Sequence, residues 1–131
     1  MKSRHVSRVI AATPAAVYAY ASNPDNLTAW AAGLARSGVT RQGNSLLVDS
    51  PMGRVTVTFA PHNEYGVIDH DVRLPSGVVV NNPVRILAHP EGAEILFTIR
   101  QRDLSDEEFD RDSAAVERDL DTLRRRIEER A

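Results

Sequence analysis

The sequence has no cysteine, a single tryptophan and only two methionines among its 131 residues. Without cysteine these residues can form no disulfide, thiolate nucleophile, zinc-thiolate site or iron-sulfur cluster. This composition fits a reducing compartment, and the cytoplasm is the expected location. Stability must then come from packing, and 131 residues are enough for one hydrophobic core, so we expect a single domain over residues 1–131.

Neither sign of charge is in large excess. Sixteen Lys and Arg residues stand against eighteen Asp and Glu residues, a formal net charge of -2. This balance offers no electrostatic basis for binding nucleic acid, so no such partner is expected.

No segment approaches the roughly 18 apolar residues needed to cross a bilayer, and residues 1–17 lack the pattern of a secretory signal. No membrane span is therefore expected.

The first thirty residues carry two helix-start signals. Residues 4–11 mix β-branched and polar residues and predict a strand. Thr13-Pro14 then places a good N-cap before proline at the first helical position, which predicts a short helix over residues 14–21. Asn23-Pro24 repeats the signal and predicts a second short helix carrying Leu27 and Trp30.

Residues 38–101 consist of short β-rich runs separated by glycine, proline and asparagine, which predicts hairpins of an antiparallel meander. With the first strand this makes about seven strands. After the stretch 104–109 the chain becomes strongly helical to its end. Its apolar stripe has spacings of four, three and four: Val116, Leu120, Leu123 and Ile127. The predicted fold is α+β, with a curved seven-stranded antiparallel sheet around one long C-terminal helix and two short helices after the first strand.

This order of elements resembles the START-like helix-grip superfamily, and within it the polyketide cyclase/dehydrase-like group known as SRPBCC. The resemblance is carried by Ala12 to Tyr18, by Ser22 to Leu27 with Trp30, and by Asp112 to Glu128. It implies a deep, largely apolar cavity between sheet and terminal helix for a lipid, polyketide, aromatic or other hydrophobic small molecule. The superfamily includes carriers, cyclases, dehydratases, hydrolases and protein-binding modules, and fold does not choose among them.

The stretch 66–77 contains an Asp-His-Asp triplet. Alternation along a strand sends His70 to the face of Ile68, Val72 and Leu74, and sends Asp69 and Asp71 to the other face. A metal site of all three is therefore excluded on a regular strand, and no other histidine has zinc-ligand spacing, so no metal or cofactor is expected. His70 is interpreted either as a core histidine whose partner is a backbone carbonyl, a water or a nearby hydroxyl, or as a polar anchor or general acid/base for a ligand.

The next β-rich run, residues 78–89, puts Asn82 on the same face as Val80, Val84 and Ile86. Asn82 is either a second polar group in the cavity or a cap for a bulge at Pro83, which lacks a backbone donor and could reverse the facing beyond it. Four aromatic side chains are further ligand-binding candidates that could equally be packing residues: Tyr18, Trp30, Phe59 and Phe97. Met52, at a hairpin turn, could gate the mouth of the cavity.

Three hypotheses of function follow. The leading one is binding of a hydrophobic small molecule in the internal cavity, by a chain that could form a homodimer. The second is a cofactor-free cyclase, dehydratase or hydrolase that uses His70 as acid/base and Asn82 to steady a carbonyl or enolate. The third is a protein-interaction module whose cavity has collapsed. The sequence leaves open whether the protein is an enzyme.

Overall fold

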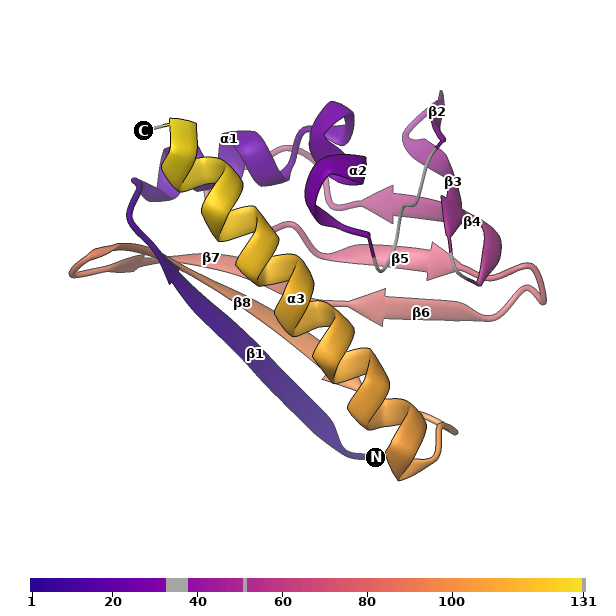
Figure 1. The fold of residues 1–131 in the computed structure, drawn as a ribbon. Coiled ribbons are helices and arrows are strands. Elements are labelled where there is room, and N and C mark those ends of the chain that lie inside the picture. The colour runs from indigo at the N-terminus through magenta and orange to yellow at the C-terminus, as the bar shows by residue number, and fades with distance from the viewer. Residues whose placement is uncertain (33–37, 51, 131) are drawn as a thin grey trace.

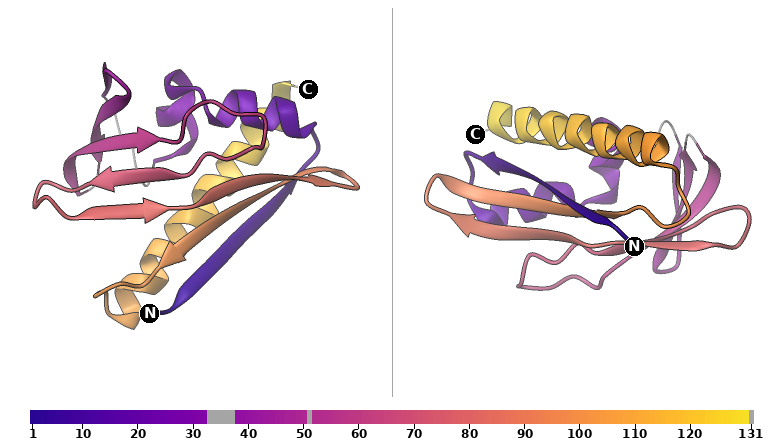
Figure 2. Two further views of the ribbon diagram at one scale, coloured as in Figure 1. Left: turned by 180° about the vertical axis from the view of Figure 1, so that it is seen from behind. Right: turned by 90° about the horizontal axis from the view of Figure 1, so that it is seen from below.

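A computed structural model describes residues 1–32, 38–50 and 52–130 of the chain. The helices are α1 (Pro14–Ala21), the 3₁₀ helix η1 (Pro24–Asn26), α2 (Leu27–Trp30) and α3 (Asp106–Arg130). The strands are β1 (Ser3–Ile10), β2 (Val39–Gln42), β3 (Ser45–Ser50), β4 (Gly53–Phe59), β5 (His70–Arg73), β6 (Val79–Asn82), β7 (Val84–His89) and β8 (Gly92–Arg100). The α3 helix crosses the sheet diagonally and forms a separate layer over it (Figures 1 and 2). The predicted α+β class and helix-grip arrangement are confirmed.

The strand count differs from the seven expected in one sheet. The described strands form a three-stranded sheet, in the order β1-β8-β7, and a five-stranded sheet, in the order β2-β3-β4-β5-β6, with antiparallel pairing throughout. The difference arises at Pro83, which separates β6 from β7. Proline has no N–H to donate to a ladder, so the run expected as one strand becomes two.

Backbone hydrogen bonds nevertheless join the two sheets around Pro83. The Thr98 N–H donates to the Pro83 carbonyl over 2.9 Å, and the Ile68 N–H donates to the Val84 carbonyl over 2.8 Å. Val84 and Ile86 are buried and Arg85 is exposed, so the facing does not reverse beyond Pro83. Figure 1 shows β6 leading into β7 along one line. The sheet therefore behaves as a curved surface with one interruption.

The predicted caps hold the short helices. The Thr13 hydroxyl accepts a hydrogen bond from the Ala16 N–H at 3.1 Å, and α1 covers the expected residues 14–21. The Asn23 side chain accepts from the Asp25 N–H at 3.0 Å. The predicted second helix consists of two short parts. The 3₁₀ turn η1 leads directly into the four residues of α2, in which Leu27 and Trp30 are buried.

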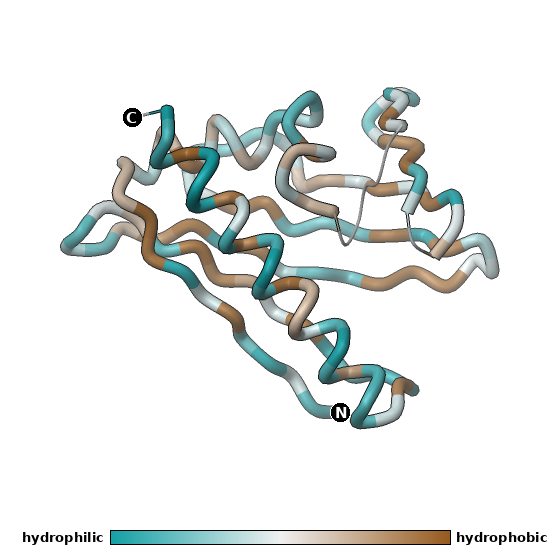
Figure 3. The backbone as a smooth tube through the Cα atoms, in the orientation of Figure 1, coloured by the Kyte–Doolittle hydropathy of each residue, from teal (hydrophilic) through white to brown (hydrophobic). Residues whose placement is uncertain are grey.

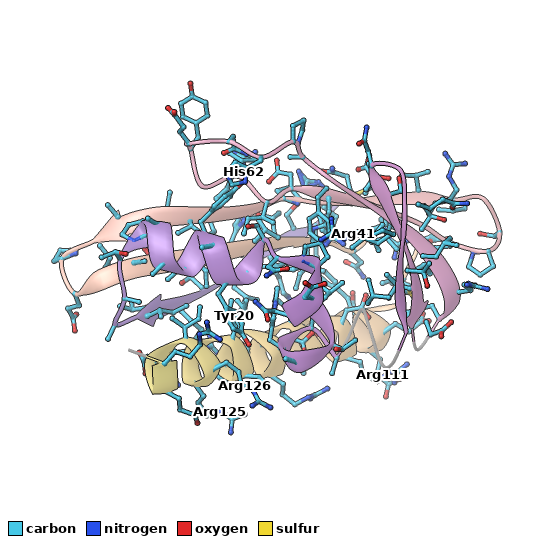
Figure 4. The ribbon with its side chains drawn as sticks, turned by 90° about the horizontal axis from the view of Figure 1, so that it is seen from above. Tyr20, Arg41, His62, Arg111, Arg125 and Arg126 are labelled. Atoms are coloured by element: carbon cyan, nitrogen blue, oxygen red, sulfur yellow. The ribbon has the colours of Figure 1, made fainter. Side chains whose placement is uncertain are left out.

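The α3 helix begins with a reciprocal cap and buries the predicted stripe. Ser105 and Glu108 exchange hydrogen bonds of 2.9 and 3.1 Å between side chain and backbone. The buried residues of α3 are Phe109, Ser113, Leu120, Leu123 and Ile127, and Val116 packs partly buried beside them. Apolar positions recur along α3 and along the strands beneath it (Figure 3), while Arg125 and Arg126 point away from the sheet (Figure 4).

Two ion pairs fasten α3 to the edge strand β1. Arg4 lies 2.6 Å from Asp110 and Arg8 lies 2.7 Å from Asp121. Both pairs are partly exposed and join α3 to the three-stranded sheet. None of the helices in residues 1–32, 38–50 and 52–130 is long and apolar enough to span a bilayer.

Candidate functional site

A cavity of about 150 Å³ lies between α3, α2 and the inner face of the sheet. Its apolar lining comes from the strands through Phe59, Val72, Val80, Val84 and Phe97, from the segment before β5 through Ile68, and from the helices through Leu27, Trp30, Val116 and Leu120. Met52 also lines it, and because this side chain is 53% exposed, the cavity reaches the surface there. The interior is therefore not collapsed.

His70 lies in this cavity between two aromatic rings. It is the first residue of β5, where it pairs with Phe59 on β4 and Asn82 on β6. Its ring centroid is 5.1 Å from that of Phe59 and 5.9 Å from that of Phe97, the second in an edge arrangement. The residue is only 6% exposed, as the strand alternation predicts.

The hydrogen bonds of His70 define its tautomer. Nδ1 lies 3.1 Å from the Ile68 carbonyl oxygen, which can only accept, so Nδ1 carries the hydrogen. Nε2 is then the lone-pair nitrogen, and it lies 3.5 Å from the Asn82 side-chain amide nitrogen, a long and weak contact. Burial lowers the pKa of His70, against the smaller raising effects of the Ile68 hydrogen bond and of Asp69 and Asp71. His70 is therefore a neutral hydrogen-bond acceptor at neutral pH.

The two aspartates beside His70 point away from the cavity, as predicted. Asp69 forms a two-pronged ion pair with Arg85 and also accepts from the Val84 N–H at 2.8 Å. The Arg85 hydrogen bond lowers the pKa of Asp69. Asp71 accepts from the Asn81 side chain at 2.8 Å. In the part of the chain that the structure describes, no three His, Cys, Asp or Glu side chains could jointly hold a metal ion.

The remaining candidates separate into two groups. Trp30, Phe59, Asn82 and Phe97 line the cavity with His70. Tyr18 is not among the lining residues: its hydroxyl accepts from the Asn63 N–H at 3.0 Å and lies 3.3 Å from Nδ1 of His62. His62 lies in the loop beside α1 (Figure 4), so Tyr18 anchors that loop.

The alternative role for Asn82, capping the interruption at Pro83, is filled by another residue. The Val84 N–H, next to the proline, donates to Asp69. The Asn82 side chain instead faces Nε2 of His70. Both polar groups that the sequence predicted for the cavity are thus neighbours on adjacent strands.

Sequence reasoning missed the charged residues of the cavity lining. Its lining includes Arg100, Arg102, Asp112 and Asp119. Desolvation raises the pKa of Asp112, while the charge of Arg102 opposes this effect. A signal was present for the aspartates: Asp112 and Asp119 stand four residues before and three after Val116, so they share the inward face of α3. No comparable pattern marks the arginines.

Comparisons with known proteins support the fold. No protein-family model matches the sequence, and the comparison with curated proteins gives no match either. An uncharacterized protein from Bacillus thuringiensis is similar with a TM-score of 0.76 at 13% identity, over 96% of this chain and 98% of that one. The Aha1 dimer from Colwellia psychrerythraea gives 0.74 at 15% identity, over 98% and 97%. Protein MLL2253 from Mesorhizobium loti gives 0.73 at 11%, over 99% and 98%. At these identities the likeness concerns the fold alone.

Proposed function

We propose that this protein binds a hydrophobic small molecule in the cavity between its sheet and α3, as a START-like protein of the SRPBCC kind. The observation that carries the proposal is the cavity itself: apolar side chains from the strands, α2 and α3 surround an open interior that reaches the surface at Met52. Such pockets, with a few placed polar groups, are typical of small-molecule sites. His70 and Asn82 supply polar groups of this kind.

The cavity volume favours one of the expected ligand classes. About 150 Å³ is the size of cavity that accommodates a benzene-sized molecule. A long-chain lipid or a multi-ring polyketide would need the cavity to enlarge. A single-ring aromatic compound is therefore the class that fits the present shape, and its ring can pack against Phe59 and Phe97.

Catalysis by His70 stays a hypothesis alongside binding. The Nε2 lone pair could accept a proton from a bound ligand, and Asn82 could steady the negative charge that develops on a carbonyl. Replacing His70 with glutamine separates the two roles once a substrate is known. A carrier would keep its ligand affinity within a few-fold, and an enzyme would lose turnover.

Toluene provides a direct test of binding, read out by thermal unfolding. At a concentration about ten times its Kd, a ligand adds about 1.4 kcal/mol of stability, or roughly 4 °C in Tm for a chain of this size. Val116→Phe and Val80→Phe should each fill the cavity and remove this rise. Leu87→Phe is the matched control, because Leu87 is exposed on the outer face of β7.

Two results would contradict the binding proposal. One is a wild-type Tm that toluene leaves unchanged. The other is an equal rise in all three phenylalanine variants, since binding would then lie outside the cavity. The homodimer also stays a prediction, and sedimentation equilibrium of the purified chain would test it.

A further inference from the structure

Two buried side-chain donors lack a hydrogen-bond partner, and both belong to residues that line the cavity. They are the indole Nε1 of Trp30 and the guanidinium Nε of Arg102, and no other buried side-chain nitrogen or oxygen among the described residues lacks a partner. Buried polar groups in proteins are nearly always paired, so each exception calls for an explanation. Because both are donors, a ligand that completes them must present acceptor atoms.

The backbone at Arg102 gives an independent indication. Arg102 has a φ of 53°, the only positive φ of a described residue other than glycine. Left-handed backbone at a residue with a large side chain is unfavourable, and such strain tends to persist where a side chain has to be held in a particular place. The turn is held by the Leu104 N–H, which donates to the Gln101 carbonyl at 3.0 Å, and by the Gln101 side chain.

Nε is the unpaired donor of the Arg102 guanidinium. Nη1 faces Asp103 at 3.9 Å, a contact at the limit of an ion pair. The opposite edge is formed by Nε and Nη2, whose parallel N–H groups match the two oxygens of a carboxylate. Arg100 adds a second positive charge to the lining, while Asp112 and Asp119 bring negative charge from α3.

We propose that the ligand is a small aromatic carboxylic acid whose ring occupies the apolar part of the cavity and whose carboxylate pairs with Arg102. The indole N–H of Trp30 donates to one of the same carboxylate oxygens, each of which has a second lone pair to accept it. The ring lies in the part of the cavity beside Phe59, His70 and Phe97. This inference rests on the proposed binding function and specifies the chemistry of its ligand.

Isothermal titration with three single-ring probes tests the assignment. Benzoate carries a carboxylate, benzyl alcohol is neutral, and benzylamine is cationic. A charge-assisted, two-pronged pair should make benzoate bind about tenfold more tightly than benzyl alcohol, with benzylamine weakest. Arg102→Gln should remove the preference for benzoate and leave benzyl alcohol unchanged within about twofold. Arg102→Lys, which keeps the charge but not the fork, should lie between the two.

Controls keep the test independent of folding. Arg125→Gln removes an arginine from the outer face of α3 and should leave all three affinities unchanged. Benzyl alcohol binding reports in each variant that the cavity is intact. Trp30→Phe keeps a ring at the cavity and removes the N–H, so it should weaken benzoate binding several-fold.

The outcomes distinguish the carboxylate assignment from the proposal that the cavity binds a hydrophobic small molecule. Equal binding of benzoate and benzyl alcohol, unaffected by Arg102→Gln, would overturn the carboxylate assignment and leave the apolar site standing. A preference for benzylamine that Asp112→Asn abolishes would also overturn it, in favour of a cationic ligand. Binding of none of the three probes would contradict both proposals.

Discussion

The carboxylate of Asp69 lies 2.6 Å from Nη2 of Arg85 and accepts a second hydrogen bond from its Nε at 2.8 Å. The same carboxylate accepts from the N–H of Val84, the residue after Pro83. Asp69 therefore provides the partner for a buried residue's backbone at the point where the ladder is interrupted. It joins the segment before β5 to the start of β7.

Asp69→Ala should destabilise the protein by about 2 kcal/mol, because it leaves the Val84 N–H unpaired in a buried position. Asp69→Asn keeps an acceptor oxygen and should cost about half as much. Arg85→Ala should cost less than about 1 kcal/mol, since this side chain is largely exposed and an exposed pair contributes little. Urea unfolding at neutral pH measures all three. A larger loss in Arg85→Ala than in Asp69→Ala would contradict the role given to the backbone contact.

The protonation of His70 should make stability depend on pH. Its pKa is lowered in the folded state, so the unfolded chain binds the proton more readily. Unfolding free energy should be highest above the unfolded pKa, about 6.5, and should fall below it by up to about 1.4 kcal/mol per pH unit. His70→Gln cannot be protonated and should flatten this dependence below about pH 6.5.

Urea unfolding at several pH values checks this expectation. His62→Gln is the matched control, because His62 is exposed. Its unfolding free energy should keep the wild-type slope. If His70→Gln and the wild type had the same slope, another group would be responsible for the acid sensitivity.

Arg102→Asn should separate stability from ligand binding. Asparagine tolerates the left-handed conformation better than arginine, so the variant should be as stable as the wild type or up to about 1 kcal/mol more stable. Its affinity for benzoate should nevertheless fall about tenfold, as for Arg102→Gln. Thermal unfolding and titration of the same preparation provide the two measurements. A large loss of stability would instead indicate that the arginine side chain supports the fold.

Gly66→Ala should be strongly destabilising. Gly66 has a φ of 71°, and an added Cβ would lie 2.6 Å from the Ile86 carbonyl oxygen, which is backbone and cannot move aside cheaply. We expect a loss of about 3 kcal/mol or more, because strain and overpacking add. Gly43→Ala is the control, with a φ of 62° and nothing within 4 Å of the added atom. It should cost only about 1 kcal/mol by urea unfolding.

The sequence predicted those features that depend on local periodicity. Alternation along residues 68–74 placed His70 inside and both aspartates outside, and cap residues located α1 and the start of η1. The split at Pro83 could be suspected, but the backbone partner supplied by Asp69 depends on a contact fifteen residues apart. Arg102 could not be found from the sequence, because an arginine gives no sign of the left-handed backbone that it adopts in the turn between β8 and α3.

Met52 connects the composition of the chain to the entrance of the cavity. Since the sequence has no cysteine, the thioethers of its two methionines are its most readily oxidised side chains. Met52 is 53% exposed and lines the opening, whereas Phe59 and Phe97 lie farther from solvent. Peroxide would therefore convert an apolar side chain at the opening into a polar sulfoxide and leave the core residues unchanged.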